Sequence, residues 1–193
     1  MLIYNPFNEG NKIVNDLVTV TDLTATILDY AGIDKPKYMT GTSFLKDDFN
    51  RKYVYAARDQ WDEIMDKSRA IVTKKWKYIR NYKPEIPYDA GQAYLEFYRP
   101  AVHIMRTAKS KNLLTNAQLH FFKESKDLEE LYDLENDPHE INNLALDPSF
   151  QNVMNKFRID MEEYNKRYRP MSDEYEPIIC LLYTSPSPRD EQS

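Results

Sequence analysis

The order of apolar and polar residues predicts four β-strands in the middle of the chain. The expected strands span residues 53–57, 68–73, 75–82 and 131–134. Each is short and rich in aromatic or β-branched residues, which is typical of strands. Because the second and third are joined by a very short connection, we expect one antiparallel sheet of four strands.

A helical spacing of apolar residues predicts a long helix near the C-terminus, over residues 149–167. The apolar positions recur every three or four residues, so this helix is expected to pack against the rest of the fold. These positions are Phe150, Val153, Met154, Phe157, Met161, Tyr164 and Tyr168.

A shorter helix is expected over residues 23–31, after a short β-rich segment at residues 16–20. Its apolar face is formed by Leu23, Ile27 and Tyr30. Thr21 or Asp22 can cap its start, and Gly32 stands where a left-handed residue commonly ends a helix. The rest of the chain offers this apolar face little to pack against.

A long insertion, residues 83–127, separates the third and fourth strands. Residues 90–105 are expected to be partly helical, with an interruption near Pro100. The order Thr-Asn-Ala-Gln at residues 115–118 is a capping box that opens a short helix through Phe122.

Residues 129–145 form the corner between the last strand and the last helices. Asp137, Pro138 and Glu140 have the order of a helix start, and Asp147-Pro148 repeats the pattern before the long helix. The corner is expected to be structural. The elements together predict an α+β fold in which the four-stranded antiparallel sheet packs with the long C-terminal helix.

Composition and charge narrow the classes of protein. Charged residues make up 30% and hydrophobic residues 41% of the 193, a balance typical of a folded globular chain. The net charge of −5 argues against general nucleic-acid binding, which needs a basic face. No apolar run approaches the roughly 20 residues of a membrane span.

The last residues have a different character from the rest. Residues 180–190 match, residue for residue, the translation of a transposon-type sequencing adapter. Residues 176–193 are therefore interpreted as a non-native tail on a fragment of environmental origin. This interpretation removes Cys180, the only cysteine, from any redox or nucleophilic role.

Common catalytic and metal motifs are absent from the sequence. The chain has no Gly-x-Ser-x-Gly turn, phosphate loop or dinucleotide fingerprint, and its three histidines lie far apart. Asp133, Glu135 and Asp137 alternate like the start of a calcium loop. Pro138 and Leu144 then occupy the positions that need Gly and Glu, so these carboxylates are expected to serve turns and solvent.

Two segments could bind a ligand. Residues 74–83 mix basic and aromatic side chains, as in a polyanion-binding strand, although a half-exposed structural strand has the same pattern. Residues 58–69 place charges on a loop between strands, where substrate contacts are common. Surface ion pairs on a solvated loop are the alternative there.

Several of these segments resemble the C-terminal part of the type I sulfatases, the formylglycine-dependent sulfuric ester hydrolases. Residues 16–33 resemble the family's D-x-x-P-T-x-L-x-x-A-G helix, residues 41–45 its G-x-S loop, and residues 69–81 its C-terminal subdomain. Residues 130–145 are the most specific part of the match. Ala25 replaces the usual Pro and loosens the helix start. Among subgroups, the chain looks most like the heparan N-sulfatase-type and related polysaccharide sulfatases.

The resemblance implies a parent enzyme that hydrolyses sulfate esters or sulfamates of a sulfated carbohydrate. It would use a formylglycine hydrate beside a divalent cation, usually calcium. The C/S-x-P-x-R motif that yields formylglycine is absent, and the metal ligands are expected upstream of Met1. The chain alone is therefore expected to bind no calcium and to be inactive, with no catalytic or metal residue assigned. By analogy the parent would be periplasmic or secreted.

The resemblance also divides the chain. Residues 1–48 would close an alkaline-phosphatase-like α/β catalytic domain whose N-terminal core is missing, and residues 49–175 would form the C-terminal sulfatase subdomain. Because this subdomain packs on the catalytic core and often lines the substrate cleft, five charged residues are candidates for substrate binding. They are Arg58, Asp59, Asp62, Glu63 and Arg69.

Two other interpretations remain open. The chain could be a free-standing α+β module that binds an anionic glycan through residues 74–83. It could also derive from a degenerate sulfatase-like protein without catalysis. Upstream sequence would distinguish a catalytic parent from these two interpretations, because only a catalytic parent needs the Cys or Ser of the formylglycine motif.

Overall fold

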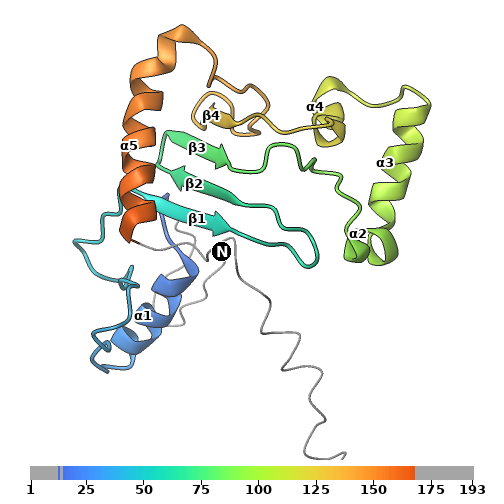
Figure 1. Cartoon of the computed structure of the whole chain (residues 1–193). Helices are drawn as coiled ribbons and strands as arrows, with labels where there is room; N and C mark the ends of the chain where they lie inside the picture. The colour runs from blue at the N-terminus through green and yellow to red at the C-terminus, as the bar shows by residue number, and fades with distance from the viewer. Residues whose placement is uncertain (1–12, 14, 168–193) are drawn as a thin grey trace, which may run out of the picture.

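The computed structural model describes residues 13 and 15–167 and shows an α+β architecture (Figure 1). The elements are α1 (Val20–Tyr30), β1 (Val54–Arg58), β2 (Ser68–Val72), β3 (Trp76–Asn81), α2 (Ala93–Tyr98), α3 (Pro100–Ser110), α4 (Asn116–Leu119), η1 (His120–Phe122), β4 (Glu129–Asp133), η2 (Pro148–Phe150) and α5 (Gln151–Arg167). The predicted fold class is confirmed. No helix in the described part of the chain has the length and apolar character needed to cross a membrane. The predicted tail, with residues 180–190, and Tyr168 lie outside the described residues.

The four strands form one antiparallel sheet in the order β1-β2-β3-β4. The Thr73 hydroxyl accepts a hydrogen bond from the Trp76 backbone N–H at 2.7 Å and closes the tight turn between β2 and β3. The register aligns Ile71, Tyr78 and Leu131 side by side across three strands. The fourth strand begins at Glu129, two residues before the predicted start, because Glu129 and Glu130 pair with β3.

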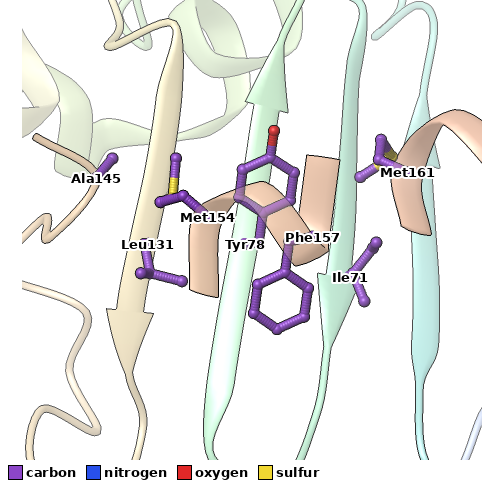
Figure 2. Packing of buried hydrophobic residues seen from close by; sticks show 7 residues of the cluster. All are labelled: Ile71, Tyr78, Leu131, Ala145, Met154, Phe157 and Met161. Carbon is purple, nitrogen blue, oxygen red and sulfur yellow. The ribbon is translucent and has the colours of Figure 1, made fainter. Parts of the chain in front are cut away.

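The apolar core lies between the sheet and α5, which runs across the strands (Figure 1). Figure 2 shows the side chains of this core. The rings of Tyr78 and Phe157 stack with centroids 5.8 Å apart, and Met154 and Met161 of α5 are also buried. Full burial of one such side chain contributes about 1.5–3 kcal/mol to stability. The packing of α5 on the sheet is therefore a main source of stability for β2, β3 and β4.

The helix start predicted at Asp147 is confirmed. The Asp147 carboxylate accepts from the Ser149 N–H at 2.8 Å, Pro148 opens η2, and α5 follows directly. The apolar spacing of α5 also agrees with the prediction, since Phe157 is 3% exposed.

The helix start predicted at Asp137 is wrong, because this segment is a turn. The Asp137 carboxylate accepts from the N–H groups of Ile141 at 2.8 Å and Asn142 at 2.7 Å, too far along the chain for an N-cap. Glu140 has φ 55°, a left-handed conformation that interrupts a helix, and its side chain pairs with Lys77 at 2.6 Å instead of completing a capping box.

The first helix, α1, begins earlier than predicted. Thr19 is the N-cap, and Asp22 completes a capping box by accepting from the Thr19 N–H at 2.7 Å. The β-rich segment predicted at residues 16–20 is therefore not a strand. Gly32 has φ 68° and ends the helix in the left-handed conformation, as expected.

The loop at residues 41–45 packs on the start of α1. Asp22 is fully buried, accepts from the Thr42 N–H at 2.8 Å and pairs with Arg51. Gly41 lies so close to the Thr21 carbonyl that a Cβ would collide with it. The opposite, apolar side of α1 is open: Val20, Leu23, Ile27 and Tyr30 are 86%, 37%, 59% and 60% exposed.

The insertion between β3 and β4 carries α2, α3 and α4, which lie beyond one end of the strands (Figure 1). Pro100 is the first residue of α3 and produces the predicted interruption, and the capping box at Thr115 is confirmed. Asn81 holds the two ends of the insertion together. Its backbone N–H donates to the Leu128 carbonyl at 3.0 Å and its side chain to the Asp127 carbonyl at 2.7 Å.

Candidate functional site

The five charged residues predicted to contact substrate lie on the loop that joins β1 to β2 and on the adjoining ends of these two strands. A backbone bridge between Trp61 and Ile64, with hydrogen bonds of 2.8 and 2.9 Å, closes its tip. The loop is therefore shaped by its own backbone, and its charged side chains are presented from a defined hairpin.

The base of this loop brings Arg58, Asp59 and Arg69 together. The Arg69 guanidinium is 4% exposed and donates to the Asp59 carboxylate at 2.5 Å and to the carbonyls of Arg58 at 3.0 Å and Ser68 at 2.8 Å. Arg69 thus bonds to both strands and to the loop. Because the guanidinium forms several hydrogen bonds at once, it fixes the loop. The side chains of Arg58 and Asp59 remain partly exposed, at 37% and 27%.

Arg58 belongs to a second ion cluster at the same end of the sheet. It pairs with Asp66, whose other carboxylate oxygen accepts from Lys126 at 2.6 Å. Lys126 and Asp66 are both almost completely buried, with side chains 1% and 5% exposed. Since removal of one partner leaves an uncompensated buried charge, this cluster ties the loop firmly to the end of the insertion.

The two candidates at the tip of the loop, Asp62 and Glu63, do not contact Arg58, Asp59 or Arg69. They contact the insertion. Asp62, with φ 50°, accepts from the Gln92 side chain, and the Glu63 carboxylate accepts from the Ala93 N–H at 2.5 Å. This hydrogen bond from a backbone N–H lowers the pKa of Glu63. Asp62 and Glu63 therefore hold the start of α2, a contact that the sequence did not predict.

The basic residues of the segment 74–83 do not form one basic face. Lys74 pairs with Asp16 at 2.9 Å, and Lys77 pairs with Glu140 at 2.6 Å. Lys75 lies near two carboxylates, Asp133 at 3.9 Å and Glu135 at 3.5 Å. The alternation of the strand sends successive cations to opposite faces, where most meet acidic partners.

Arg80 of the same strand belongs to a cluster centred on Glu129. The Arg158 guanidinium donates to both oxygens of Glu129, at 2.9 and 2.6 Å, the Tyr78 hydroxyl donates at 2.6 Å, and Arg80 lies 3.1 Å away. These donors, led by Arg158, lower the pKa of Glu129 to about 2. Burial raises the pKa of Tyr78, and the hydrogen bond to Glu129 adds to it.

Glu130, on the other face of β4, is held by neutral groups. It is 2% exposed and accepts from the Asn81 amide at 2.6 Å and from the hydroxyls of Tyr88 at 3.0 Å and Tyr132 at 2.7 Å. Burial, with the Glu130 charge, raises the pKa of both tyrosines. A hollow of about 800 Å³ lies beside this cluster and includes His120 and His139 in its lining.

The part of the chain that the structure describes offers no cluster of ligands for a metal ion. Among the described residues no three His, Cys, Asp or Glu side chains are arranged to hold one. Asp133, rejected above as a calcium ligand, accepts from the Glu135 N–H at 3.1 Å and from the Asn136 side chain at 2.9 Å, so it stabilises a turn. The ion clusters are suited to binding and positioning.

Sequence comparison assigns the chain to a family. Residues 1–90 and 85–167 match the family described as N-sulphoglucosamine sulphohydrolase, C-terminal, and the chain belongs to this family. This agrees with the predicted resemblance to the C-terminal part of a sulfatase.

Individual relatives are consistent with that assignment. Two proteins of Formosa agariphila, each named Ulvan-active sulfatase, are 36% and 30% identical, over 77% and 79% of this chain and 25% and 29% of their own lengths. A solved structure of a 2-O GAG sulfatase shares the fold, with a TM-score of 0.54 and 22% identity over 81% of this chain and 27% of that chain. The chain thus spans about a quarter of the length of the curated relatives it matches.

Proposed function

We propose that this chain is the C-terminal part of a sulfuric ester hydrolase that acts on a sulfated carbohydrate. The family match over residues 1–90 and 85–167 is the observation that supports this most strongly. Two relatives named Ulvan-active sulfatase add support for a polysaccharide substrate. In this proposal residues 1–48 complete the catalytic domain, and residues 49–175 are the C-terminal subdomain.

The exposed face of α1 fits this proposal. A row of apolar side chains on one side of a short helix is unfavourable in water, and it is expected where another part of the protein covers it. The other side of α1 is already occupied, because the 41–45 loop packs there. We propose that the catalytic core covers the side formed by Val20, Leu23, Ile27 and Tyr30.

We further propose that the β1–β2 loop lines the substrate cleft. Arg58, with Asp59 beside it, is the candidate for contact with the sugar, because its side chain is 37% exposed at the outer side of the loop. Arg69, Asp62 and Glu63 would act by holding the loop in place. The formylglycine and calcium implied by the resemblance would be supplied by the catalytic domain.

A chimera tests the proposal. Residues 17–167 would replace the corresponding segment of the 36% identical relative, and turnover of an aryl sulfate would be measured. We expect the chimera to retain activity within about tenfold of the relative and the 193-residue chain alone to have none. A folded chimera without turnover, or turnover by the chain alone, would contradict the proposal.

The role of the loop is tested in the same chimera with Arg58→Lys, which keeps the charge opposite Asp66 but removes the planar guanidinium. We expect KM for the polysaccharide to rise several-fold while turnover of the small aryl sulfate is unchanged. Arg51→Lys is the matched control, because Arg51 also pairs with a buried aspartate but lies outside the loop. An equal change of KM in the two variants would contradict the proposal that Arg58 lines the cleft.

A further inference from the structure

A basic cavity of about 610 Å³ is lined by α5 and by the second half of β3, and the candidate loop tip, with Asp62 and Glu63, is not part of its lining. Its walls come from the sheet and from the last turns of α5. The lining residues are Lys67, Arg69, Tyr78, Arg80, Tyr82, Arg158, Met161, Glu162, Asn165 and Lys166. The volume lies within the range of about 300–1,000 Å³ that is usual for small-molecule sites.

Positive charge is in excess in this cavity. Five of its lining residues are cations and only Glu162 is an anion. The three arginines show this excess directly: Arg69 is matched by Asp59, but Arg80 and Arg158 share one carboxylate, Glu129. Like charges gathered in one place repel each other, so an anion that enters this cavity relieves the repulsion.

The excess is local. The whole chain carries a net charge of −5, so a positive cavity is not a general property of its surface. The opposite arrangement occurs in the insertion. There one cation, Arg106, is bound by two carboxylates, Asp89 at 3.0 Å and Glu96 at 2.7 Å. Long-range attraction of nucleic acid is therefore unfavourable, and a small anion is the better fit.

The cavity also offers an apolar surface beside its cations. The Tyr82 ring is 38% exposed, and its hydroxyl accepts a hydrogen bond of 2.7 Å from the Asn165 amide. Lys67 and Arg80 lie 5.7 and 6.0 Å from the centre of this ring. An amphipathic ring held in this way can pack against the C–H face of a sugar while neighbouring cations bind its charged group.

We propose that this cavity binds a hexose that carries an oxyanion, either a sulfate ester or a carboxylate. Arg80, Arg158 and Lys166 bind the anionic group, and Tyr82 packs against the sugar ring. This site needs no catalytic centre, so it does not depend on the function proposed above.

Calorimetric titration of the 193-residue chain tests the site with four probes: glucose 6-sulfate, glucuronate, glucose and inorganic sulfate. We expect at least one of the two charged sugars to bind at least tenfold more tightly than glucose and inorganic sulfate. Which of the two binds better identifies the anionic group. Equal affinity for glucose 6-sulfate and inorganic sulfate, with no affinity for glucuronate, overturns the proposal of a sugar site.

Two matched pairs of variants locate the binding. Lys166→Gln should weaken binding of the charged sugar about tenfold, whereas Lys156→Gln should not, because Lys156 is an exposed lysine of the same helix that lines a different groove. Tyr82→Ala should abolish the preference for the sugar over inorganic sulfate, and Tyr82→Phe should keep it. Equal effects of the two lysine variants, or an unchanged preference in Tyr82→Ala, would contradict the proposal. The binding measurement is independent of turnover by the chimera.

Discussion

Glu129 and Glu130 are neighbours in β4, yet their carboxylates lie on opposite faces of the sheet and are held by different chemistry. Glu129 faces α5 and is bound by two arginines and the Tyr78 hydroxyl. Glu130 faces away from α5 and is bound by an amide and two tyrosine hydroxyls. The difference arises because successive residues of a strand point to opposite faces.

The two faces are stabilised in different ways as a result. The α5 face combines an apolar core with a charge cluster at its edge, so its polar contacts depend on pH and salt. On the opposite face, Glu130 depends on hydrogen bonds from neutral groups, which need accurate geometry. Variants on each face should separate these two contributions.

The largest expected effect is on the apolar core of the α5 face. Phe157→Ala removes the ring that stacks on Tyr78 and should lower the free energy of unfolding by about 3–5 kcal/mol. Urea unfolding followed by circular dichroism measures this loss. The adjacent exposed residue provides the control, since Lys156→Ala should change stability by less than about 0.5 kcal/mol. Similar losses in both variants would show that α5 does not pack on the sheet.

The next effect is on the opposite face. Glu130→Ala leaves the Asn81 amide and two tyrosine hydroxyls without their acceptor, at a cost of about 3 kcal/mol. The same urea experiment measures it, with Glu124→Ala, an exposed glutamate nearby, as control. A loss below about 1 kcal/mol would mean that water reaches these donors and that the face is open at this point.

Glu129 should make stability depend on pH. Its pKa falls from 4.5 to about 2 on folding, so the folded state binds fewer protons than the unfolded state in this range. The resulting stabilisation, roughly 2–3 kcal/mol, is complete well above pH 4.5 and is lost as the pH falls towards 2. The difference in unfolding free energy between wild type and Glu129→Gln should shrink over this window. A constant difference from pH 6 to pH 2.5 would exclude this linkage.

The smallest effects come from single hydroxyl groups. Tyr88→Phe removes one of three donors to Glu130 and should cost about 1–1.5 kcal/mol, because the remaining charge is poorly compensated. Tyr78→Phe should cost less, about 0.5–1 kcal/mol, because Arg158 still holds Glu129. Thermal unfolding of the pair gives the order. A larger loss of stability in Tyr78→Phe than in Tyr88→Phe would contradict the expected difference between the two faces.

Periodic patterns predicted most of the fold. The spacing of Phe157 and Met161 and the capping box at Thr115 depend only on local geometry, and the structure confirms both. The turn at Asp137 was misread because Asp-Pro opens helices and turns alike. What decides between them is remote in sequence: Glu140 pairs with Lys77 of β3, and the Leu144 N–H donates to the Leu131 carbonyl at 2.8 Å.

The ligand-binding candidates were predictable only in part. Arg80 and Tyr82 belong to the basic and aromatic segment 74–83 that the sequence indicated, and both line the basic cavity. The sequence could not show that Arg158 and Lys166 complete that cavity, because this depends on where α5 crosses the sheet. Arg158, Glu162, Asn165 and Lys166 follow helical spacing, a polar stripe that was available as a signal beside the apolar one.

The contact at Asn81 has a consequence for how the chain tolerates change in length. Asn81 joins the two ends of the insertion, so this segment leaves and re-enters the sheet at almost the same point. The entropy lost in closing such a loop grows only with the logarithm of its length, about 0.6 kcal/mol for each doubling. Segments of very different size can therefore be exchanged between β3 and β4 while the pairing of these strands is kept.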